Sequence, residues 1–288
     1  MKLDNKCVDG DIYSMKKLIL PNHPANVRDK NSIDVHVLGW IDSTKVEKMN
    51  KLLQMENLER HYETPAGVVK ALDGIDLEIH EGERVILLGP SGSGKTTLLN
   101  CLSALDSPTA GDYMFQGNEV PRSHSERMTS FRRENIGYVF QFFNLLQDLT
   151  VLENIHLIQE LAGRKERGSS KSEDSARAKE LLKLVGLEAE INRFPGEISG
   201  GQQQRVAIAR SIAKRPTLLL GDELTGNLDT ETSNKVMEAL VSACQQENIT
   251  AVFVTHDEGL VKYASRVIRI DSGKIISDEK IDSSDEEA

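Results

Sequence analysis

The sequence predicts an α/β fold in which a mostly parallel sheet is covered by helices, with an antiparallel β annex before it and a helical block inserted into it. Alternating apolar residues between positions 58 and 79 indicate antiparallel hairpins. Apolar residues at helical spacing between positions 149 and 186 indicate the inserted helices. The parallel sheet is predicted from continuous apolar runs, typical of strands buried on both faces, at Val85–Leu88, Ile136–Phe140, Thr217–Leu220 and Ala251–Thr255.

The composition is that of a folded globular protein. The 288 residues are 39% hydrophobic and 28% charged, with 21 glycines and 8 prolines, which excludes collagen-like and fully disordered classes. The net charge of −10 gives the chain as a whole no electrostatic reason to bind nucleic acid. No apolar run approaches the roughly 20 residues of a membrane-spanning helix. The three cysteines share no metal-binding spacing, so we expect a reducing, cytoplasmic compartment.

Three segments are predicted along the chain. Residues 1–51 have mixed charge and no sustained periodicity, and we interpret them as an N-terminal extension of unknown role. Residues 52–276 contain the predicted strands and helices and form the main domain. Residues 277–288 are acidic and predict a solvated C-terminal tail.

A glycine-rich loop follows the first buried strand and precedes a helical stretch. Its pattern is G-x-x-x-x-G-K-[S/T], in which backbone N–H groups surround phosphates and the helix N-terminus adds positive potential. In this pattern Lys95 neutralises β- and γ-phosphate oxygens, and the hydroxyl of Thr96 is a ligand for Mg²⁺. The sequence therefore predicts nucleotide binding by Gly89, Pro90, Ser91, Gly92, Ser93, Gly94, Lys95, Thr96 and Thr97.

Two adjacent carboxylates end a second buried strand. Asp222 and Glu223 follow the apolar run Leu218–Leu220 and Gly221. In such a pair one acid holds Mg²⁺ through water and the next orients the attacking water. Asp222 is therefore the candidate metal residue and Glu223 the candidate general base. A solvated strand end is the alternative interpretation of the pair.

A Ser-Gly-Gly-Gln turn, Ser199–Gln202, opens an amphipathic helix with Val206, Ala209 and Ala213 on one face. The N-terminus of such a helix is a second anion site of the same physical kind as the glycine-rich loop. One chain thus has two phosphate cradles. Together with the loop and the acid pair, this segment resembles the signature motif of the ATP-binding-cassette (ABC) ATPases, and the resemblance covers about residues 53–276.

The resemblance implies a P-loop NTPase core of the RecA-like type, ATP and Mg²⁺ as cofactors, and roles for further residues. Gln141 matches the lid glutamine that contacts Mg²⁺ and water, and His256 matches the histidine that contacts the γ-phosphate. Tyr62 stands where the family stacks an aromatic ring on adenine. In the family the second cradle binds the nucleotide of the opposite protomer, and the matching residues here are Ser199, Gly200, Gly201, Gln202 and the dimer-contact Asp229.

Finer detail resembles one subgroup of that family. The segments Phe131–Gln141 and Thr225–Asp229 are similar to the lipoprotein-releasing, macrolide-efflux and cell-division ATPases, which are partners of separate four-helix permeases. Two residues depart from the family pattern. Ile198 replaces the usual Leu before Ser-Gly-Gly, and Leu224 replaces the usual Pro after the catalytic Glu. The second change frees the backbone and restores an N–H, so it bears on the stiffness of the loop beside the catalytic carboxylate.

The resemblance implies an ATPase subunit that closes around two ATP·Mg²⁺, either with a second copy of itself or with a paralogous subunit. It also implies a separate multi-span permease that holds the ATPase at the cytoplasmic face of a membrane. An alternative function is a soluble, non-transport cassette ATPase that acts as an assembly or signalling switch. The candidate docking groove for the permease, with core packing as the alternative interpretation, consists of Phe142, Phe143, Leu145 and Leu146.

Overall fold

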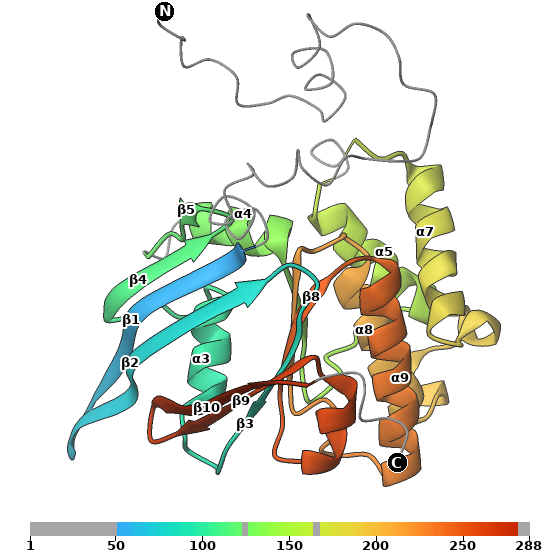
Figure 1. Ribbon diagram of the computed structural model, residues 1–288. Helices are drawn as coiled ribbons and strands as arrows, with labels where there is room; N and C mark the ends of the chain where they lie inside the picture. The colour runs from blue at the N-terminus through green and yellow to red at the C-terminus, as the bar shows by residue number, and fades with distance from the viewer. Residues whose placement is uncertain (1–50, 123–125, 164–167, 282–288) are drawn as a thin grey trace, which may run out of the picture. The chain divides into compact units, whose positions relative to one another are not determined.

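The computed structural model describes residues 51–122, 126–163 and 168–281 (Figure 1). These residues all belong to one compact unit, which spans residues 47–288. The predicted N-terminal extension, apart from Lys51, lies outside the described residues, and so does the end of the predicted tail. The predicted division into three segments therefore stays a prediction at its N-terminal boundary.

The core is a six-stranded sheet in the order β10-β9-β3-β8-β7-β6. Strand β3 pairs in parallel with both β8 and β9, and β7 pairs in parallel with both β6 and β8. The four apolar runs predicted as parallel strands all lie in this sheet, which confirms that prediction. The strands are β3 (Arg84–Leu88), β6 (Ile136–Val139), β7 (Leu218–Asp222), β8 (Thr250–Val254), β9 (Arg266–Asp271) and the antiparallel edge strand β10 (Lys274–Lys280).

The antiparallel annex is a four-stranded sheet in the order β2-β1-β4-β5. Its strands are β1 (Lys51–Thr64), β2 (Gly67–His80), β4 (Ala110–Phe115) and β5 (Asn118–Glu119). Strand β2 runs through the turn-favouring pair Asp73-Gly74 without a break. The β1–β2 pairing shifts register there, and the positive φ of 82° at Gly74 and 46° at Asn57 accommodates the bulge.

Helices follow the predicted order, with an inserted block between β6 and α8. Three of them begin with a Ser or Thr that caps the helix and a Glu or Gln three residues later that bonds back to the cap. Among the described residues, no helix is both long enough and apolar enough to cross a bilayer. The helices are α3 (Lys95–Leu102), α4 (Glu126–Asn135), α5 (Val151–Leu161), α7 (Lys171–Leu184), α8 (Gly200–Ile212) and α9 (Thr230–Gln246), with short 3-10 turns η2 (Glu188–Glu190), η3 (Pro195–Glu197) and η4 (Glu258–Tyr263).

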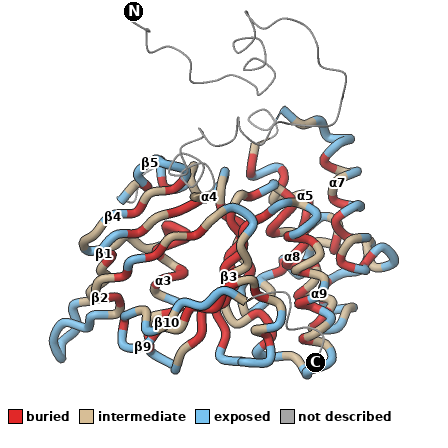
Figure 2. The backbone as a smooth tube through the Cα atoms, viewed as in Figure 1, coloured by how far each residue is buried: buried red, intermediate tan, exposed pale blue. Residues whose placement is uncertain are grey.

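Both faces of the core sheet are buried, as its continuous apolar strands predict. Along β3, Ile86 and Leu88 belong to one hydrophobic cluster, which also contains residues of α5, α7, α8 and α9. The alternate residues Val85 and Leu87 belong to a second cluster, shared with α3 and the annex. Figure 2 shows the buried backbone concentrated in these central strands, with exposed residues on the outer loops and helix faces. The fold therefore has helices on one face of the sheet and the annex with α3 on the other (Figure 1).

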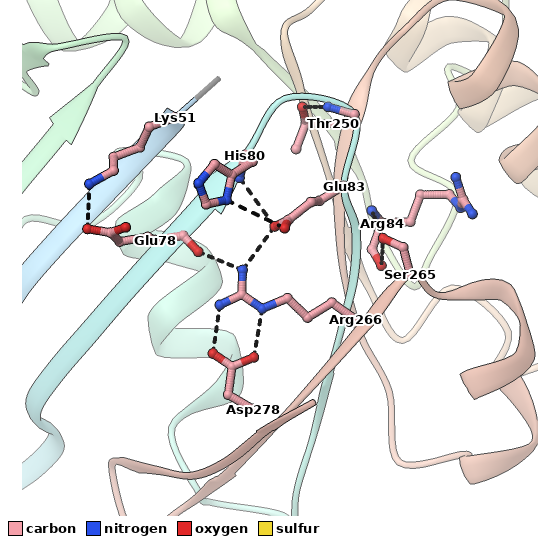
Figure 3. Close-up of polar contacts among 10 residues, drawn as sticks. Lys51, Glu78, His80, Glu83, Arg84, Thr250, Ser265, Arg266 and Asp278 are labelled. Atoms are coloured by element: carbon pink, nitrogen blue, oxygen red, sulfur yellow. Dashed lines mark hydrogen bonds and ion pairs between the residues drawn. The ribbon is translucent and has the colours of Figure 1, made fainter. Parts of the chain in front are cut away.

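A cluster of charged side chains joins β2 of the annex to the edge of the core sheet (Figure 3). The guanidinium of Arg266, on β9, donates to both carboxylate oxygens of Asp278 at 2.7 and 2.6 Å. It also donates to Glu83 Oε2 at 2.9 Å and to the backbone carbonyl of Glu78 at 2.7 Å. Residues Ser277–Lys280 of the predicted tail lie in β10, where they pair with β9, and Asp278 neutralises a nearly buried arginine.

Candidate active site

The glycine-rich loop connects β3 to α3 and lies where the core sheet approaches the annex. A Cβ atom on Gly89 would overlap the carbonyl oxygen of Ile270, and one on Gly94 would overlap the carbonyl oxygen of Ala71. Both glycines also have positive φ, 152° and 106°. Glycine is therefore required at these two positions for the backbone to come this close to its neighbours.

Lys95 is buried in the loop although it carries a full charge. Lys95 is only 7% exposed. Its Nζ donates to the carbonyl oxygens of Gly89 and Pro90, both at 2.8 Å. The hydroxyl of Ser93 is buried in the same loop with no hydrogen-bond partner. An unpaired cation and an orphaned hydroxyl beside a helix N-terminus fit a polyanion such as a triphosphate.

Hard oxygen ligands converge at the start of α3 and the end of β7. The hydroxyl of Thr96 lies 3.5 Å from Oδ1 of Asp222, a long hydrogen bond. Burial, followed by the negative charge of Glu223, raises the pKa of Asp222 above its ordinary value. A divalent cation relieves both penalties, because it replaces lost hydration and offsets the neighbouring charge. A hydroxyl and a carboxylate are also the ligands that Mg²⁺ prefers, so these residues fit that ion.

Glu223 directly contacts His256, which follows the end of β8. The Nδ1 atom of His256 lies 3.0 Å from Oε1 and 2.9 Å from Oε2 of Glu223. Gln141 also approaches this carboxylate: a Cβ built on Gly226 lies 3.4 Å from Nε2 of Gln141 and 3.8 Å from Oε2 of Glu223. Glu223 and His256 therefore come together although they follow two different strands, and the amide of Gln141, which follows a third, lies beside Gly226 in the same turn.

A cleft of about 530 Å³ joins part of the glycine-rich loop to Glu223 and His256. Glu223 and His256 line it opposite Ser91, Gly92, Gly94, Lys95, Thr96 and Thr97. Sequence reasoning missed part of this lining, because no pattern marks it. The missed residues come from β2, from the end of β8 and from the turn between β9 and β10, and they are Val69, Lys70, Ala71, Val254, Ser272 and Gly273.

Tyr62 lies on β1 and is not among the described residues that line this cleft. Its hydroxyl donates to Oδ2 of Asp106 at 2.7 Å, and the guanidinium of Arg60 lies 4.4 Å above its ring. Burial, followed by the bond to Asp106, raises the pKa of Tyr62. The ring is thus held by these two contacts, and stacking on adenine stays a prediction.

The second predicted cradle lies at the N-terminus of α8. Ser199 and Gln202 satisfy each other there: Gln202 N donates to Ser199 Oγ at 3.3 Å, and Ser199 N donates to Gln202 Oε1 at 2.9 Å. A Cβ on Gly201 would overlap the methyl group of Thr232, so glycine lets α8 pack against α9. None of the described residues Ser199–Gln202 lines the cleft beside the glycine-rich loop, which we call the P-loop cleft. The two cradles of one chain are therefore separate sites.

Asp229 has a clear structural task in addition to its predicted dimer contact. It is the N-cap of α9, and it accepts hydrogen bonds from the backbone N–H and the hydroxyl of Thr232 at 2.9 and 2.6 Å. These bonds lower the pKa of Asp229 and keep it ionised. Its place in nucleotide binding stays a prediction.

Comparison with known proteins agrees with this geometry. The family model described as "ABC transporter" matches residues 72–226. The lipoprotein-releasing system ATP-binding protein LolD of Geobacter metallireducens is 44% identical over 230 residues, which is 80% of this chain and 100% of that protein. Both matches include the glycine-rich loop and the acid pair.

Two solved structures show the same fold. The dimeric, post-hydrolysis structure of the ATP-binding cassette MJ0796, bound to ADP and Pi, has a TM-score of 0.72 and 38% identity, and the match covers 81% of this chain and 100% of that one. The structure of cbiO1 from Clostridium perfringens, part of the ABC transporter complex cbiONQ, has a TM-score of 0.71 and 27% identity over 80% of this chain and 89% of that one. The chain therefore belongs to the ABC transporter family, and it is an ATP-binding subunit that hydrolyses ATP.

Proposed function

We propose that this ATPase uses the P-loop cleft to close two protomers around ATP·Mg²⁺ and passes the closing motion to a separate membrane permease. The observation that carries the proposal is the single cleft that Glu223, His256, Lys95 and Thr96 all line. This cleft brings the phosphate-binding candidates Lys95 and Thr96 together with the candidate base and histidine. The signature residues in the second cradle lie elsewhere, which fits completion of the site by the other protomer.

The residues divide the hydrolytic work among themselves. Backbone N–H groups of the loop and Lys95 bind the phosphates, while Thr96 and Asp222 would hold Mg²⁺, which supplies charge neutralisation when bound. Glu223 accepts a hydrogen bond from the attacking water and aligns it with the γ-phosphate. His256, which contacts Glu223, would donate to the γ-phosphate. The water adds to phosphorus as the bond to the ADP oxygen breaks, which yields ADP and Pi.

The relatives favour a transport partner over the assembly switch considered as the alternative. LolD is named for a lipoprotein-releasing system, and cbiO1 is described as part of a transporter complex. We therefore propose that this chain also acts with a multi-span permease, which would hold it at the cytoplasmic face of a membrane.

The docking surface predicted from sequence needs correction. Leu145 is only 7% exposed, and Phe143 packs against the hydrophobic core, so both stabilise the fold. Phe142 and Leu146 are exposed, at 70% and 47%, but neither lines a groove among the described pockets.

A groove lies beside this segment, between α4, α5, α8 and the edge strand β6. It has a volume of about 600 Å³, and its walls include exposed apolar side chains such as Phe140 and Leu161. Four cations line it, Arg132, Arg133, Arg210 and Lys214, and among the described residues of the lining there is no carboxylate. This cationic groove is unusual in a chain with a net charge of −10.

An amphipathic helix with acidic side chains fits the cationic groove. Its apolar face would cover Phe140 and Leu161, and its carboxylates would pair with the four cations. We propose that a cytoplasmic helix of the permease supplies this partner.

The decisive variant is Glu223→Gln in the full-length protein. It keeps the shape of the side chain but removes the base, so we expect ATP binding without hydrolysis and an ATP-trapped dimer, measured by gel filtration with bound-nucleotide analysis. Normal turnover in this variant would contradict the proposed base.

The trapped variant also tests the partner. It is recovered from gently solubilised cells, and we expect a multi-span membrane protein in stoichiometric amount. Adding Arg133→Glu and Leu161→Ser should lose that protein and keep the trapped dimer, whereas Arg193→Glu, an exposed arginine outside the groove, should keep both. If soluble proteins alone are recovered, the assembly switch becomes the better function.

A further inference from the structure

Glu223 has a backbone conformation that its residue type disfavours. Its φ is +47°, in the left-handed region, where a side chain with a Cβ is strained. Strain of this kind persists only when the surrounding structure holds the residue in place. The inference below rests on the proposed role of Glu223 as the base, and it concerns what fixes its carboxylate.

Backbone hydrogen bonds fix the two sides of this residue. Glu223 N donates to the carbonyl of Val254 on β8 at 3.0 Å, and Gly226 N donates to the carbonyl of Glu223 at 3.2 Å. These bonds place the peptide groups of the turn. Neither bond involves a side chain. The side chain of the next residue, Leu224, makes a further contact with the sheet.

Leu224 buries its side chain directly after the strained residue. It is 4% exposed and belongs to the hydrophobic cluster on the helical face of the sheet. The nearest backbone to its isobutyl group is Gly221 on β7. A Cβ built on Gly221 lies 2.7 Å from Cδ1, 2.9 Å from Cδ2 and 2.9 Å from Cγ of Leu224, all closer than real carbon contacts.

Rotation of the terminal methyl groups of Leu224 alone cannot relieve this overlap. Rotation about χ2 moves Cδ1 and Cδ2 but leaves Cγ at 2.9 Å, so relief needs a change in χ1, which takes the side chain out of its buried place in the hydrophobic cluster. Gly221 is not among the residues with positive φ, so its backbone would accept any side chain. Glycine is therefore needed at position 221 for space alone, and the residue that uses the space is Leu224.

We propose that Gly221 and Leu224 act as a pair that positions the catalytic carboxylate. Leu224 stands where the family usually has proline, whose ring would fix φ and disfavour helical backbone at the preceding residue. In this chain the buried side chain of Leu224, seated over Gly221, holds the turn instead. Glu223 is thereby kept left-handed, with its carboxylate against His256 and in the P-loop cleft.

The test is a double-mutant cycle in the full-length protein, read as kcat and KM for ATP. Gly221→Ala and Leu224→Ala should each lower kcat about 10- to 100-fold, because a carboxylate displaced by about 1 Å loses its alignment with the water. KM for ATP should change less than about threefold, because neither residue binds the phosphates. In the double variant the Cβ added at position 221 occupies the space that the Leu224 side chain has left. Its kcat should therefore equal that of Leu224→Ala alone within about twofold.

Two controls separate positioning from general loss of stability. Gly196→Ala makes the same chemical change where a Cβ meets nothing within 4 Å, and it should leave kcat unchanged. Leu240→Ala removes a fully buried side chain of α9 and should lower the melting temperature without lowering kcat per folded molecule. A fall in kcat that tracks melting temperature across all of the variants would overturn the proposal.

The remaining outcomes are also decisive. Normal kcat in Leu224→Ala, or losses that multiply in the double variant, would overturn the pair while leaving the base assignment intact. Retained turnover in Glu223→Gln, which leaves the packing untouched, would instead remove the proposed function on which the pair depends.

Discussion

The hydroxyl of Thr96 and the carboxylate of Asp222 lie 3.5 Å apart, although 126 residues separate them in the chain. Thr96 is in the first turn of α3, and Asp222 ends β7, so the two meet only because α3 packs beside the core sheet. Their convergence is the geometric basis of the proposed Mg²⁺ site.

Asp222→Asn should separate metal binding from nucleotide binding. The amide cannot offset the charge of Mg²⁺, so we expect kcat in saturating Mg²⁺ to fall on the order of 10²-fold. Binding of metal-free ATP, measured by calorimetry in a chelator, should be unchanged or tighter, because a negative charge has been removed near the phosphates. Thr96→Ser keeps the hydroxyl and should retain activity. Full Mg²⁺-dependent activity in Asp222→Asn would contradict the metal assignment.

Lys95→Ala should abolish tight nucleotide binding. The buried ammonium is held by two carbonyl oxygens and has no ion pair among the described residues, so its charge is available to the triphosphate. A charge-assisted contact of this kind contributes about 1.5 to 3 kcal/mol, so the ATP dissociation constant should rise at least about 10-fold. Calorimetric titration measures it directly. An unchanged dissociation constant would refute the role of this lysine.

Tyr62→Ala should weaken binding of the base and leave the triphosphate contacts alone. Stacking on an aromatic ring contributes about 1 to 3 kcal/mol, so KM for ATP should rise roughly 5- to 100-fold. Tyr62→Phe keeps the ring but loses the bond to Asp106, and it should stay within about threefold of the parent. Inhibition by inorganic triphosphate should be the same in all three proteins. An equal loss of triphosphate binding would show that Tyr62 acts through the fold.

Arg266→Ala should destabilise the junction between the annex and the core sheet. The change leaves the carboxylates of Glu83 and Asp278 without their shared cation, and removal of one partner from a nearly buried cluster costs about 3 kcal/mol. The control is Arg269→Ala, which breaks a solvent-exposed pair with Glu258 and should cost much less than the loss of Arg266. Urea denaturation gives both values, and equal costs would contradict the importance of the junction.

Buried Lys214 should make the free energy of unfolding depend on pH in the alkaline range. Burial, followed by repulsion from Arg133, lowers the pKa of Lys214 from 10.5 to about 8 in the folded protein. Between these two values the unfolded chain binds the proton more strongly, so stability at neutral pH is reduced and recovers as pH rises from about 8 towards 10.5.

Lys214→Met removes this dependence and tests the sign. The stability of the variant relative to the parent should fall by on the order of 3 kcal/mol over that pH range, in denaturation experiments at fixed salt. The lost bond from Lys214 to the carbonyl of Arg132 adds a constant offset that does not vary with pH. A pH-independent difference would show that the lysine keeps its ordinary pKa.

Local sequence was enough to predict the elements whose chemistry is local. The continuous run Val85–Leu88 is apolar on both faces, so it had to be an internal strand of a covered sheet. The loop from Gly89 to Thr96 contains the whole G-x-x-x-x-G-K-[S/T] pattern, so its phosphate-binding role could be predicted without the rest of the fold. By contrast, the pairing of Ser277–Lys280 with β9 could not be predicted, because it depends on the meeting of Asp278 with Arg266.

The sequence by itself determined the fold class, the phosphate loop, the acid pair and the resemblance to one ATPase family, because each of these is written in residues close together in the chain. Only the tertiary structure decided which side chains meet. It brought His256 to Glu223, turned Phe143 and Leu145 towards the core, and seated Leu224 over Gly221. Distances between residues far apart in sequence follow from how whole elements pack, and no local pattern encodes that packing.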